Sequence, residues 1–135
     1  MDTLFYYLLL SGVLTILLWT PYIVARLFVW GLPVFLHNYP DRFPAEQSEP
    51  PLWAQRAHRA HLNMVETMPA LIAVIVAVSQ LGSDVAIMQA ALWAKIFLLA
   101  RIAYSVIYIA GVPFLRTPSY LLSWLAILMI AFQVL

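Results

Sequence analysis

A stretch of charged and polar residues leads into an apolar segment that is long enough to enter a membrane. The stretch is Arg56–Pro69, RAHRAHLNMVETMP, and LIAVIVAVSQL follows it after one alanine. At ~100° per residue, one helical face collects four polar side chains within roughly 80°: Arg56, Arg59, Asn63 and Glu66. In a helix over residues 53–81, about 43 Å long, Glu66 lies roughly 24 Å from Gly82, inside a hydrocarbon core of ~30 Å. A carboxylate at that depth is costly in lipid, so the sequence predicts a protein-lined polar pocket.

The composition excludes several classes of protein. Of the 135 residues, 64% are hydrophobic and only 10% are charged, and the mean hydropathy is +0.91. Such a composition is typical of several membrane-spanning helices in one domain. The net charge of +1 provides no basic surface for nucleic acid. The chain has no cysteine, so any thiol chemistry has to bring its sulfur with a substrate.

Four apolar runs predict an all-α membrane protein, a bundle of four transmembrane helices in a single domain over residues 1–135. The helices are expected over residues 3–30, 53–81, 84–110 and 118–135. The N-terminus lacks the basic region of a signal peptide and is expected to remain as the first span. Pro21 is expected to kink that span. The five prolines of the Gly31–Leu52 segment indicate a loop outside the membrane, in which His37 is solvated.

The third predicted helix carries a second polar face. Ser83 or Asp84 is expected to cap its start. The side chains that fall on one face of this helix are Phe97, Arg101, Tyr104 and Tyr108. Lys95 lies about 120° from Arg101. We therefore expect Lys95 in a different environment, either an ion pair between helices or a contact between subunits.

The distribution of basic residues predicts the orientation in the membrane. The first loop with its flanks holds Arg42, Arg56 and Arg59, the third loop holds Arg116, and the second loop holds no basic residue. By the positive-inside rule, the first and third loops face the cytosol and both termini lie outside. The polar side chains that then converge near the cytosolic side are Arg59, Glu66, Arg101, Tyr108, Arg116 and Tyr120.

This set of side chains suits a small zwitterion with more than one carboxylate. Arginine binds carboxylates in a bidentate manner, and Glu66 would bind an ammonium group. A tyrosine or an arginine would stabilise a thiolate or an oxyanion. Glutathione, with two carboxylates, one amine and one thiol, fits this description. Arg26, near the end of the first span, would either join the set or place its charge at the membrane interface.

Three segments resemble the MAPEG family, the membrane-associated proteins of eicosanoid and glutathione metabolism. They are RAHRAHLNMVETMP, ARIAYSVIYIAG and LRTPSY, and the signature R-A-x-x-N-x-x-E-x-x-P runs from Arg59 to Pro69. The resemblance covers the chain from the end of the first helix through the start of the fourth. It implies a homotrimer of four-helix subunits that binds glutathione between neighbouring subunits, facing the cytosol.

The resemblance also implies roles for individual residues. Arg116 would stabilise the glutathione thiolate by its charge, and Tyr108 would be its catalytic neighbour. Arg59, Asn63 and Glu66 would hold the charged ends of the peptide. The full set that we expect to bind glutathione is Arg26, Arg59, His61, Asn63, Glu66, Arg101, Tyr104 and Tyr120.

The chain departs from the family pattern at several places. Leu62 is apolar where some members carry a second basic residue, and Tyr104 stands where prostaglandin-synthase-like members have histidine. The loop before Arg116 aligns only with a gap. We therefore expect a bacterial-type, generic glutathione transferase or peroxidase of the inner membrane, not an eicosanoid specialist. Its second substrate would be a hydrophobic electrophile or a lipid peroxide.

Two other classes of protein stay open. A non-catalytic accessory protein would keep the trimeric scaffold and lose turnover, and it need not form a glutathione thiolate. A transporter, metal protein or haem protein would use His58 and His61, which lie about 60° apart on a helix. No third ligand stands at a usable spacing from these histidines, so we expect no resident metal.

Overall fold

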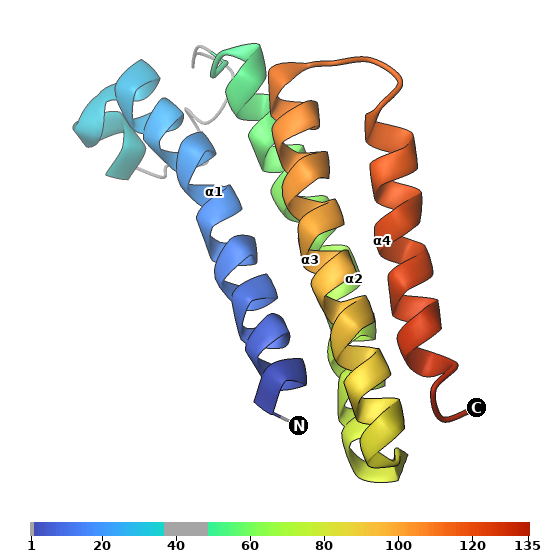
Figure 1. The fold of residues 1–135 in the computed structure, drawn as a ribbon. Helices are drawn as coiled ribbons and strands as arrows, with labels where there is room; N and C mark the ends of the chain where they lie inside the picture. Colours follow the sequence, from blue (N-terminus) through green and yellow to red (C-terminus); the bar gives the residue numbers. More distant parts are fainter. Residues whose placement is uncertain (1, 37–48) are drawn as a thin grey trace.

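A computed structural model describes residues 2–36 and 49–135, which form four helices (Figure 1). The helices are α1 (Asp2–Leu36), α2 (Leu52–Leu81), α3 (Asp84–Ala110) and α4 (Arg116–Ala131). Both termini lie at the same end of the molecule as the short α2–α3 turn, and the α3–α4 connection lies at the opposite end (Figure 1). The all-α class predicted from the sequence is confirmed.

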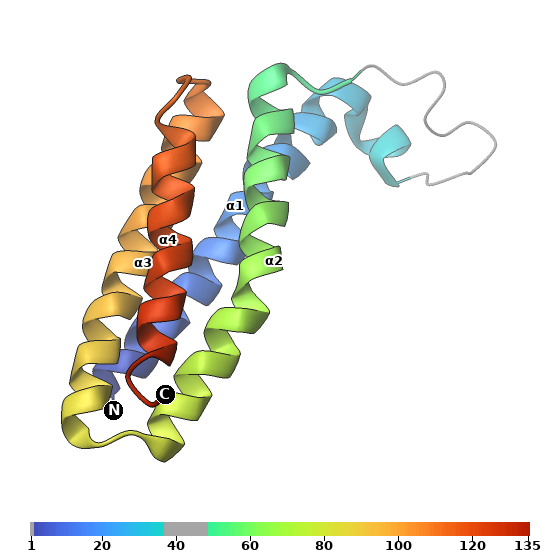
Figure 2. The same ribbon diagram turned by 90° about the vertical axis from the view of Figure 1, so that its right-hand side faces the viewer.

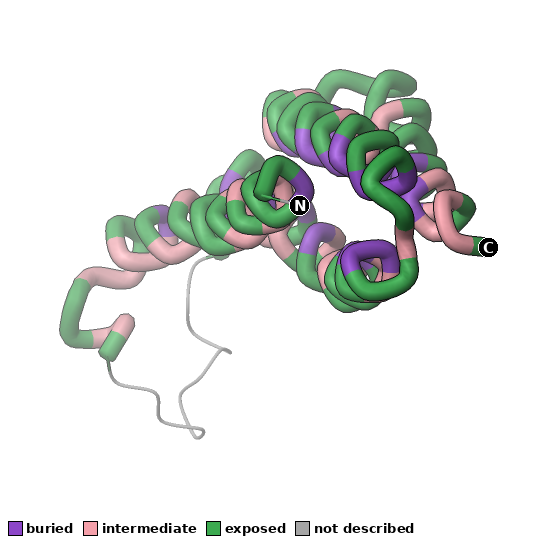
Figure 3. Tube along the Cα trace, turned by 60° about the horizontal axis from the view of Figure 1, so that its bottom comes forward, coloured by how far each residue is buried: buried purple, intermediate pink, exposed green. Residues whose placement is uncertain are grey.

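The helix pair α2–α3 is the centre of the bundle. Each of these two helices packs against the other and against both α1 and α4. Over the described residues α1 and α4 do not contact each other, and they lie on opposite sides of the central pair (Figure 3). The C-terminal part of α1 extends away from the bundle, beyond α2 (Figure 2). The end of the bundle that holds the start of α4 is therefore built from α2, α3 and α4.

The hydrophobic core lies on the inward faces of all four helices (Figure 3). Its largest fully buried apolar side chains are Leu4, Met64, Leu71, Ile75, Phe97 and Ile130. Small residues precede them on the two central helices: Ala54, Ala57, Ala60, Ala90 and Ala94 are each at most 1% exposed. Such small residues let membrane helices approach closely.

Three helices, α1, α2 and α3, are long and apolar enough to cross a membrane. Their outward faces carry large apolar side chains, such as Phe28 at 83% exposed and Ile16 at 71%, which suit contact with lipid. The 16 residues of α4 reach about 24 Å, slightly less than the ~30 Å hydrocarbon core. The structure is that of a membrane-embedded bundle in which α4 is the shortest helix.

The first helix differs from its predicted form. Its helical backbone breaks at Gly31, with φ 75° and ψ 158°, directly after the predicted end at residue 30, and a second helical stretch then continues to Leu36. The φ and ψ angles stay helical at Pro21, where a kink was expected, and the kink with non-helical backbone lies at Gly31. Glycine adopts positive φ without steric cost, and Pro33 then suits the first turn of the segment that follows. The part of the predicted loop from residue 32 to Leu36 is therefore helical, and His37 lies outside the described residues.

Both ends of α3 follow local capping rules. The Oγ of Ser83 caps α3 by accepting a hydrogen bond from the backbone N of Ala86 at 3.3 Å, as predicted. Gly111 ends α3 in the left-handed conformation. The fourth helix begins at Arg116 instead of residue 118, and it ends at Ala131 instead of 135. Pro118 fits the first turn of α4 because no intrahelical bond requires its missing N–H there.

Candidate functional site

A small polar cleft opens between α2, α3 and α4, at the start of α4. Its volume is about 200 Å³, and it is lined by Asn63, Tyr104, Tyr108, Arg116, Thr117 and Tyr120. We call it the tyrosine cleft. All of these lining side chains can form hydrogen bonds, in a chain that is 64% hydrophobic. The convergence of side chains predicted from the sequence is present for Tyr108, Arg116 and Tyr120.

Arg101 lies behind the tyrosine cleft and is almost fully buried, with 1% of its surface exposed. Its Nη1 donates to Oδ1 of Asn63 at 2.7 Å, and its Nη2 donates to Oγ1 of Thr67 at 2.9 Å. The aromatic rings around it, with centroids 5.0 to 5.6 Å from its Cζ, are those of Phe97, Tyr104 and Tyr120. Its Nε has no hydrogen-bond partner among the described residues. The guanidinium thus ties α3 to α2 and α4 at this cleft.

The tyrosine rings form a connected row that ends at Arg116. The rings of Tyr104 and Tyr108 stack with centroids 5.6 Å apart and an interplanar angle of 8°. The Tyr120 ring lies 6.1 Å from that of Tyr104. The Cζ of Arg116 lies 5.4 Å from the centroid of the Tyr108 ring, which is within cation–π range. This contact holds a positive charge at the edge of the cleft.

A larger opening adjoins the tyrosine cleft where α3 connects to α4. Its volume is about 440 Å³, and it shares Tyr108, Arg116 and Thr117 with the tyrosine cleft. Arg56, from the first turns of α2, lines its other side. The Arg56 guanidinium packs against Gly111, where any side chain would collide with it. Two arginines from different helices therefore line one opening, which favours an anionic ligand.

The remaining residues of the predicted α2 stripe lie beside these clefts. Arg59 and Glu66 are exposed and line neither of the two clefts. Glu66 is nevertheless close enough to Arg101 to interact with it electrostatically. The stripe is therefore divided: Asn63 faces the tyrosine cleft, and the two charged residues lie on a surface that this subunit leaves open.

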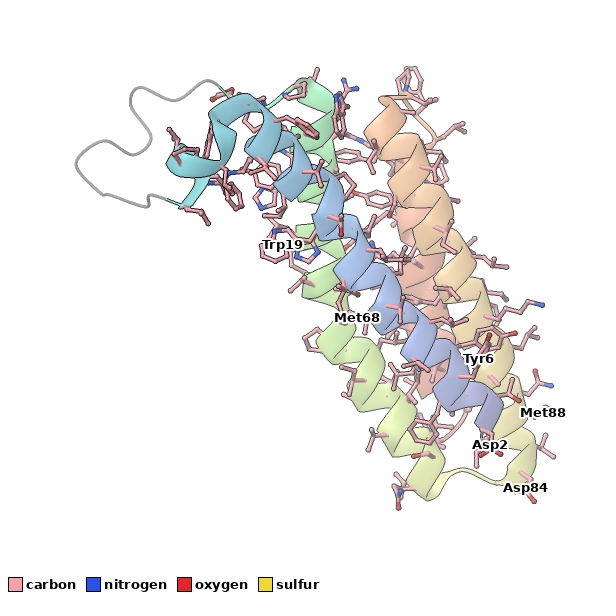
Figure 4. The ribbon with its side chains drawn as sticks, turned by 90° about the vertical axis from the view of Figure 1, so that its left-hand side faces the viewer. Asp2, Tyr6, Trp19, Met68, Asp84 and Met88 are labelled. Atoms are coloured by element: carbon pink, nitrogen blue, oxygen red, sulfur yellow. The ribbon has the colours of Figure 1, made fainter. Side chains whose placement is uncertain are left out.

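Arg26 and His61 belong to a separate cluster between α1 and α2. The Cζ of Arg26 lies 4.0 Å from the centroid of the Trp30 ring. The Nδ1 of His61 lies 2.8 Å from the carbonyl oxygen of Thr15. The His61 ring also stacks on the ring of Trp19 (labelled in Figure 4). The His61 contacts hold α2 against α1, whereas the Arg26–Trp30 contact lies within α1. Within one subunit, neither side chain lines the tyrosine cleft.

Two threonines at the site were not predicted. Thr67 lies four residues after Asn63 and so shares its helical face, a spacing that would have revealed it. Thr117 reaches the tyrosine cleft only because α4 begins at Arg116, and no sequence signal indicated that start. In addition, Arg116 itself lies in the first turn of α4, whereas the sequence placed it in the third loop.

The two histidines considered as ligands make other contacts. The His58 ring stacks on that of Tyr22, with centroids 4.2 Å apart. In the parts of the chain that the structure describes, no group of three or more His, Cys, Asp or Glu side chains is arranged to hold a metal ion.

The fold and the clefts together define a class: a helical membrane protein whose polar, arginine-bearing site opens at one end of the bundle. The chain belongs to the MAPEG family, whose family model matches residues 3–135, essentially the whole chain. This family is membrane-integral, and it includes glutathione transferases, glutathione peroxidases and eicosanoid-related members. The resemblance seen in the sequence is confirmed. No curated protein and no solved structure gives a significant match to the chain.

Proposed function

We propose that this protein is a membrane-bound, glutathione-dependent transferase or peroxidase. It would add a glutathione thiolate to hydrophobic electrophiles or reduce lipid peroxides. The observation that carries the proposal is the Arg116–Tyr108 contact, which fixes a guanidinium at the edge of the tyrosine cleft. Since the chain has no cysteine, the sulfur would come from the ligand. Membership of a family with glutathione-dependent enzymes supports the same function.

The α2 stripe supplies groups that complement the charges of glutathione. Arg59 would bind a carboxylate through its planar fork of donors, and Glu66 would bind the ammonium group. Asn63 would bind a carboxylate from inside the tyrosine cleft. Because Arg59 and Glu66 are exposed in one subunit, they suit a ligand held where two subunits meet.

We propose a homotrimer in which the four-helix subunits share their sites. Arg26 and His61, which lie on the α1 side of their own subunit, would then contact glutathione bound to the tyrosine cleft of a neighbour. Large exposed apolar side chains along α1 and α4, such as Leu17 at 58% and Trp124 at 50%, suit such packing. Chemical crosslinking in native membranes is expected to give dimers and trimers. A chain that stays monomeric would contradict the shared site.

Two features of this chain would favour the glutathione thiolate at the edge of the tyrosine cleft. A free thiol is mostly protonated at neutral pH. The Arg116 guanidinium supplies a positive charge, and the first backbone N–H groups of α4 have no intrahelical partners, so they also favour an anion. Arg116 and the start of α4 would therefore stabilise the sulfur anion once its proton has passed to water.

The reaction would balance in one of two ways. In conjugation, a new bond joins the sulfur to an electrophilic carbon, and the leaving group departs with the bonding electrons. In peroxide reduction, two glutathione molecules give one disulfide, and the hydroperoxide gives an alcohol and water. The second substrate would enter laterally from the bilayer. Phe114, 88% exposed beside the larger opening, offers an apolar surface on that path.

The sidedness of the site is part of the proposal. Arg56, Arg59 and Arg116 lie toward the end of the molecule where α2 and α4 begin, and the positive-inside rule assigns such an end to the cytosol. The site would thus face the cytosolic glutathione pool, in a bacterial inner membrane.

Calorimetric titration of the detergent-solubilised protein with glutathione tests the proposal most simply. We expect saturable binding, a rise in thiolate ultraviolet absorbance, and turnover with a generic aryl halide. Absence of glutathione binding to the folded oligomer would contradict the proposal. Binding without thiolate formation or turnover would favour the accessory protein instead.

A further inference from the structure

A third cleft lies at the opposite end of the bundle, between the first turns of α1 and the first half of α3. Its volume is about 380 Å³, and it shares no residue with the tyrosine cleft. We call it the α1–α3 cleft. Its polar lining residues are Thr3, Tyr7, Asp84 and Lys95, and its apolar lining includes Met88 and Leu92. Asp2, Asp84 and Met88 are all found at this end of the bundle (Figure 4).

Lys95 places a charge in this cleft that the subunit itself does not neutralise. Its side chain is exposed on α3, and no carboxylate among the described residues forms an ion pair with it. Its Cα lies three helical turns beyond Asp84, roughly 16 Å along the axis. An ammonium group facing lipid at that depth is costly, so an anionic partner is expected.

The level of the Lys95 ammonium follows from helix geometry. Helical side chains lean toward the N-terminus, so Lys95 reaches back about one turn, ~5 Å, toward Asp84. The 27 residues of α3 span about 40 Å, which matches a bilayer with its headgroup regions. Asp84 therefore lies at the outer headgroup level, and the ammonium of Lys95 lies roughly 11 Å below it, about 6 Å inside the hydrocarbon core.

We propose that the α1–α3 cleft binds one phospholipid whose headgroup ends in a primary ammonium. Lys95 contacts the phosphate, and Asp84, at the outer level, contacts the ammonium. The apolar lining of the cleft, with Met88 and Leu92, receives an acyl chain. The lipid comes from the leaflet at the α2–α3 turn, the non-cytosolic leaflet in the orientation proposed above.

The charges at this end select among lipids. A phosphate is required to pair with Lys95, whereas Asp84, with Asp2 at the same end, disfavours a headgroup of net negative charge. A primary ammonium both neutralises a carboxylate and donates hydrogen bonds to it, which a quaternary ammonium does not do. A second copy of the chain is a poorer partner. The acidic side chains of the described helices are Asp2, Glu66 and Asp84, and none lies at the level of Lys95.

The test is native mass spectrometry of the full chain after reconstitution with equal amounts of phosphatidylethanolamine, phosphatidylcholine and phosphatidylglycerol. We expect phosphatidylethanolamine to be retained at least fivefold over the other two. Lys95→Met should lower retention of every phospholipid by about tenfold. Lys95→Arg, which keeps the positive charge, should retain phospholipids as the unmodified protein does. Asp84→Asn should abolish only the preference for ethanolamine. Gln89→Met, a change on an exposed α3 position outside the cleft, should alter neither.

Two results would overturn the lipid site. One is equal retention of the three lipids by the unmodified protein. The other is equal phospholipid retention by the Lys95→Met variant and the Gln89→Met control, once circular dichroism has shown that Lys95→Met is folded. If Lys95→Met instead dissociates the oligomer while retention per subunit stays the same, Lys95 makes a subunit contact and the proposal is wrong.

Discussion

Nη1 of Arg101 donates a hydrogen bond to Oδ1 of Asn63 at 2.7 Å, joining α3 to α2 across 38 positions of sequence. Because arginine has only donors, the acceptor has to be the amide oxygen. The amide NH₂ is then the group that Asn63 presents to the tyrosine cleft, which it lines. A buried cation thus orients a neutral side chain so that it donates toward an anionic ligand.

Arg101→Met is expected to destabilise the protein. The change leaves Asn63 Oδ1 and Thr67 Oγ1 without their donor, at a cost of about 2–3 kcal/mol. The midpoint of thermal unfolding should fall by roughly 5–10 °C. Thr67→Val removes only one of the two hydrogen bonds and should cost about 1 kcal/mol. A thermal midpoint for Arg101→Met equal to that of the unmodified protein would refute the central role of Arg101.

Glu66→Gln is expected to weaken glutathione binding at least tenfold, since a charge-assisted hydrogen bond to an ammonium contributes about 1.5–3 kcal/mol. Calorimetry measures the affinity, and size exclusion checks that the oligomer is intact. Glu49→Gln changes an exposed carboxylate before the start of α2 and should have no effect. Unchanged affinity in an intact Glu66→Gln oligomer would remove Glu66 from the site.

Substitutions of Tyr108 separate the role of its ring from that of its hydroxyl. Tyr108→Phe keeps the ring that lies 5.4 Å from the Arg116 Cζ, so turnover with an aryl halide should stay within about threefold. Tyr108→Leu loses the cation–π contact, which contributes about 0.5–2 kcal/mol, and turnover should fall by about tenfold. Equal losses in the two variants would assign the catalytic contribution to the hydroxyl instead.

Gly111→Ala tests how closely α2 approaches the end of α3. Gly111 has φ 76°, and a side chain there would collide with the Arg56 guanidinium. We expect a loss of about 1–2 kcal/mol in the free energy of unfolding, from backbone strain and displacement of Arg56. Gly12→Ala, within α1 and with no other atom within 4 Å of the new Cβ, should be neutral or stabilising by up to ~1 kcal/mol. Equal stability of the two variants would contradict the close contact.

The helices whose ends are marked by strong local signals could be predicted from the sequence. Residues 84–110 were assigned correctly because Ser83 caps one end and Gly111 ends the other. The short helical stretch after Gly31 was missed, because a glycine with a proline two residues later is typical of a turn or loop. The start of α4 was missed because its N-cap, Leu115, has no capping side chain.

The candidate site was predictable to the extent that helical periodicity defines it. The shared face of Arg101, Tyr104 and Tyr108 follows from spacing alone, and this face lies at the tyrosine cleft. Arg26 and His61 were assigned by resemblance, and in one subunit they pack with Trp30 and Trp19. Periodicity shows that His61 lies on another face than Asn63, but it does not show which helix covers that face.

The thiolate absorbance of Arg116→Ala at saturating glutathione tests the central claim most directly. Because the charged ends of glutathione would be held by α2, this variant should bind glutathione within about threefold of the unmodified protein. It should lose most of the thiolate absorbance, since the guanidinium beside Tyr108 would no longer favour the sulfur anion. Arg116→Lys, which keeps a positive charge, should recover part of the signal. Full thiolate absorbance in Arg116→Ala would contradict the account.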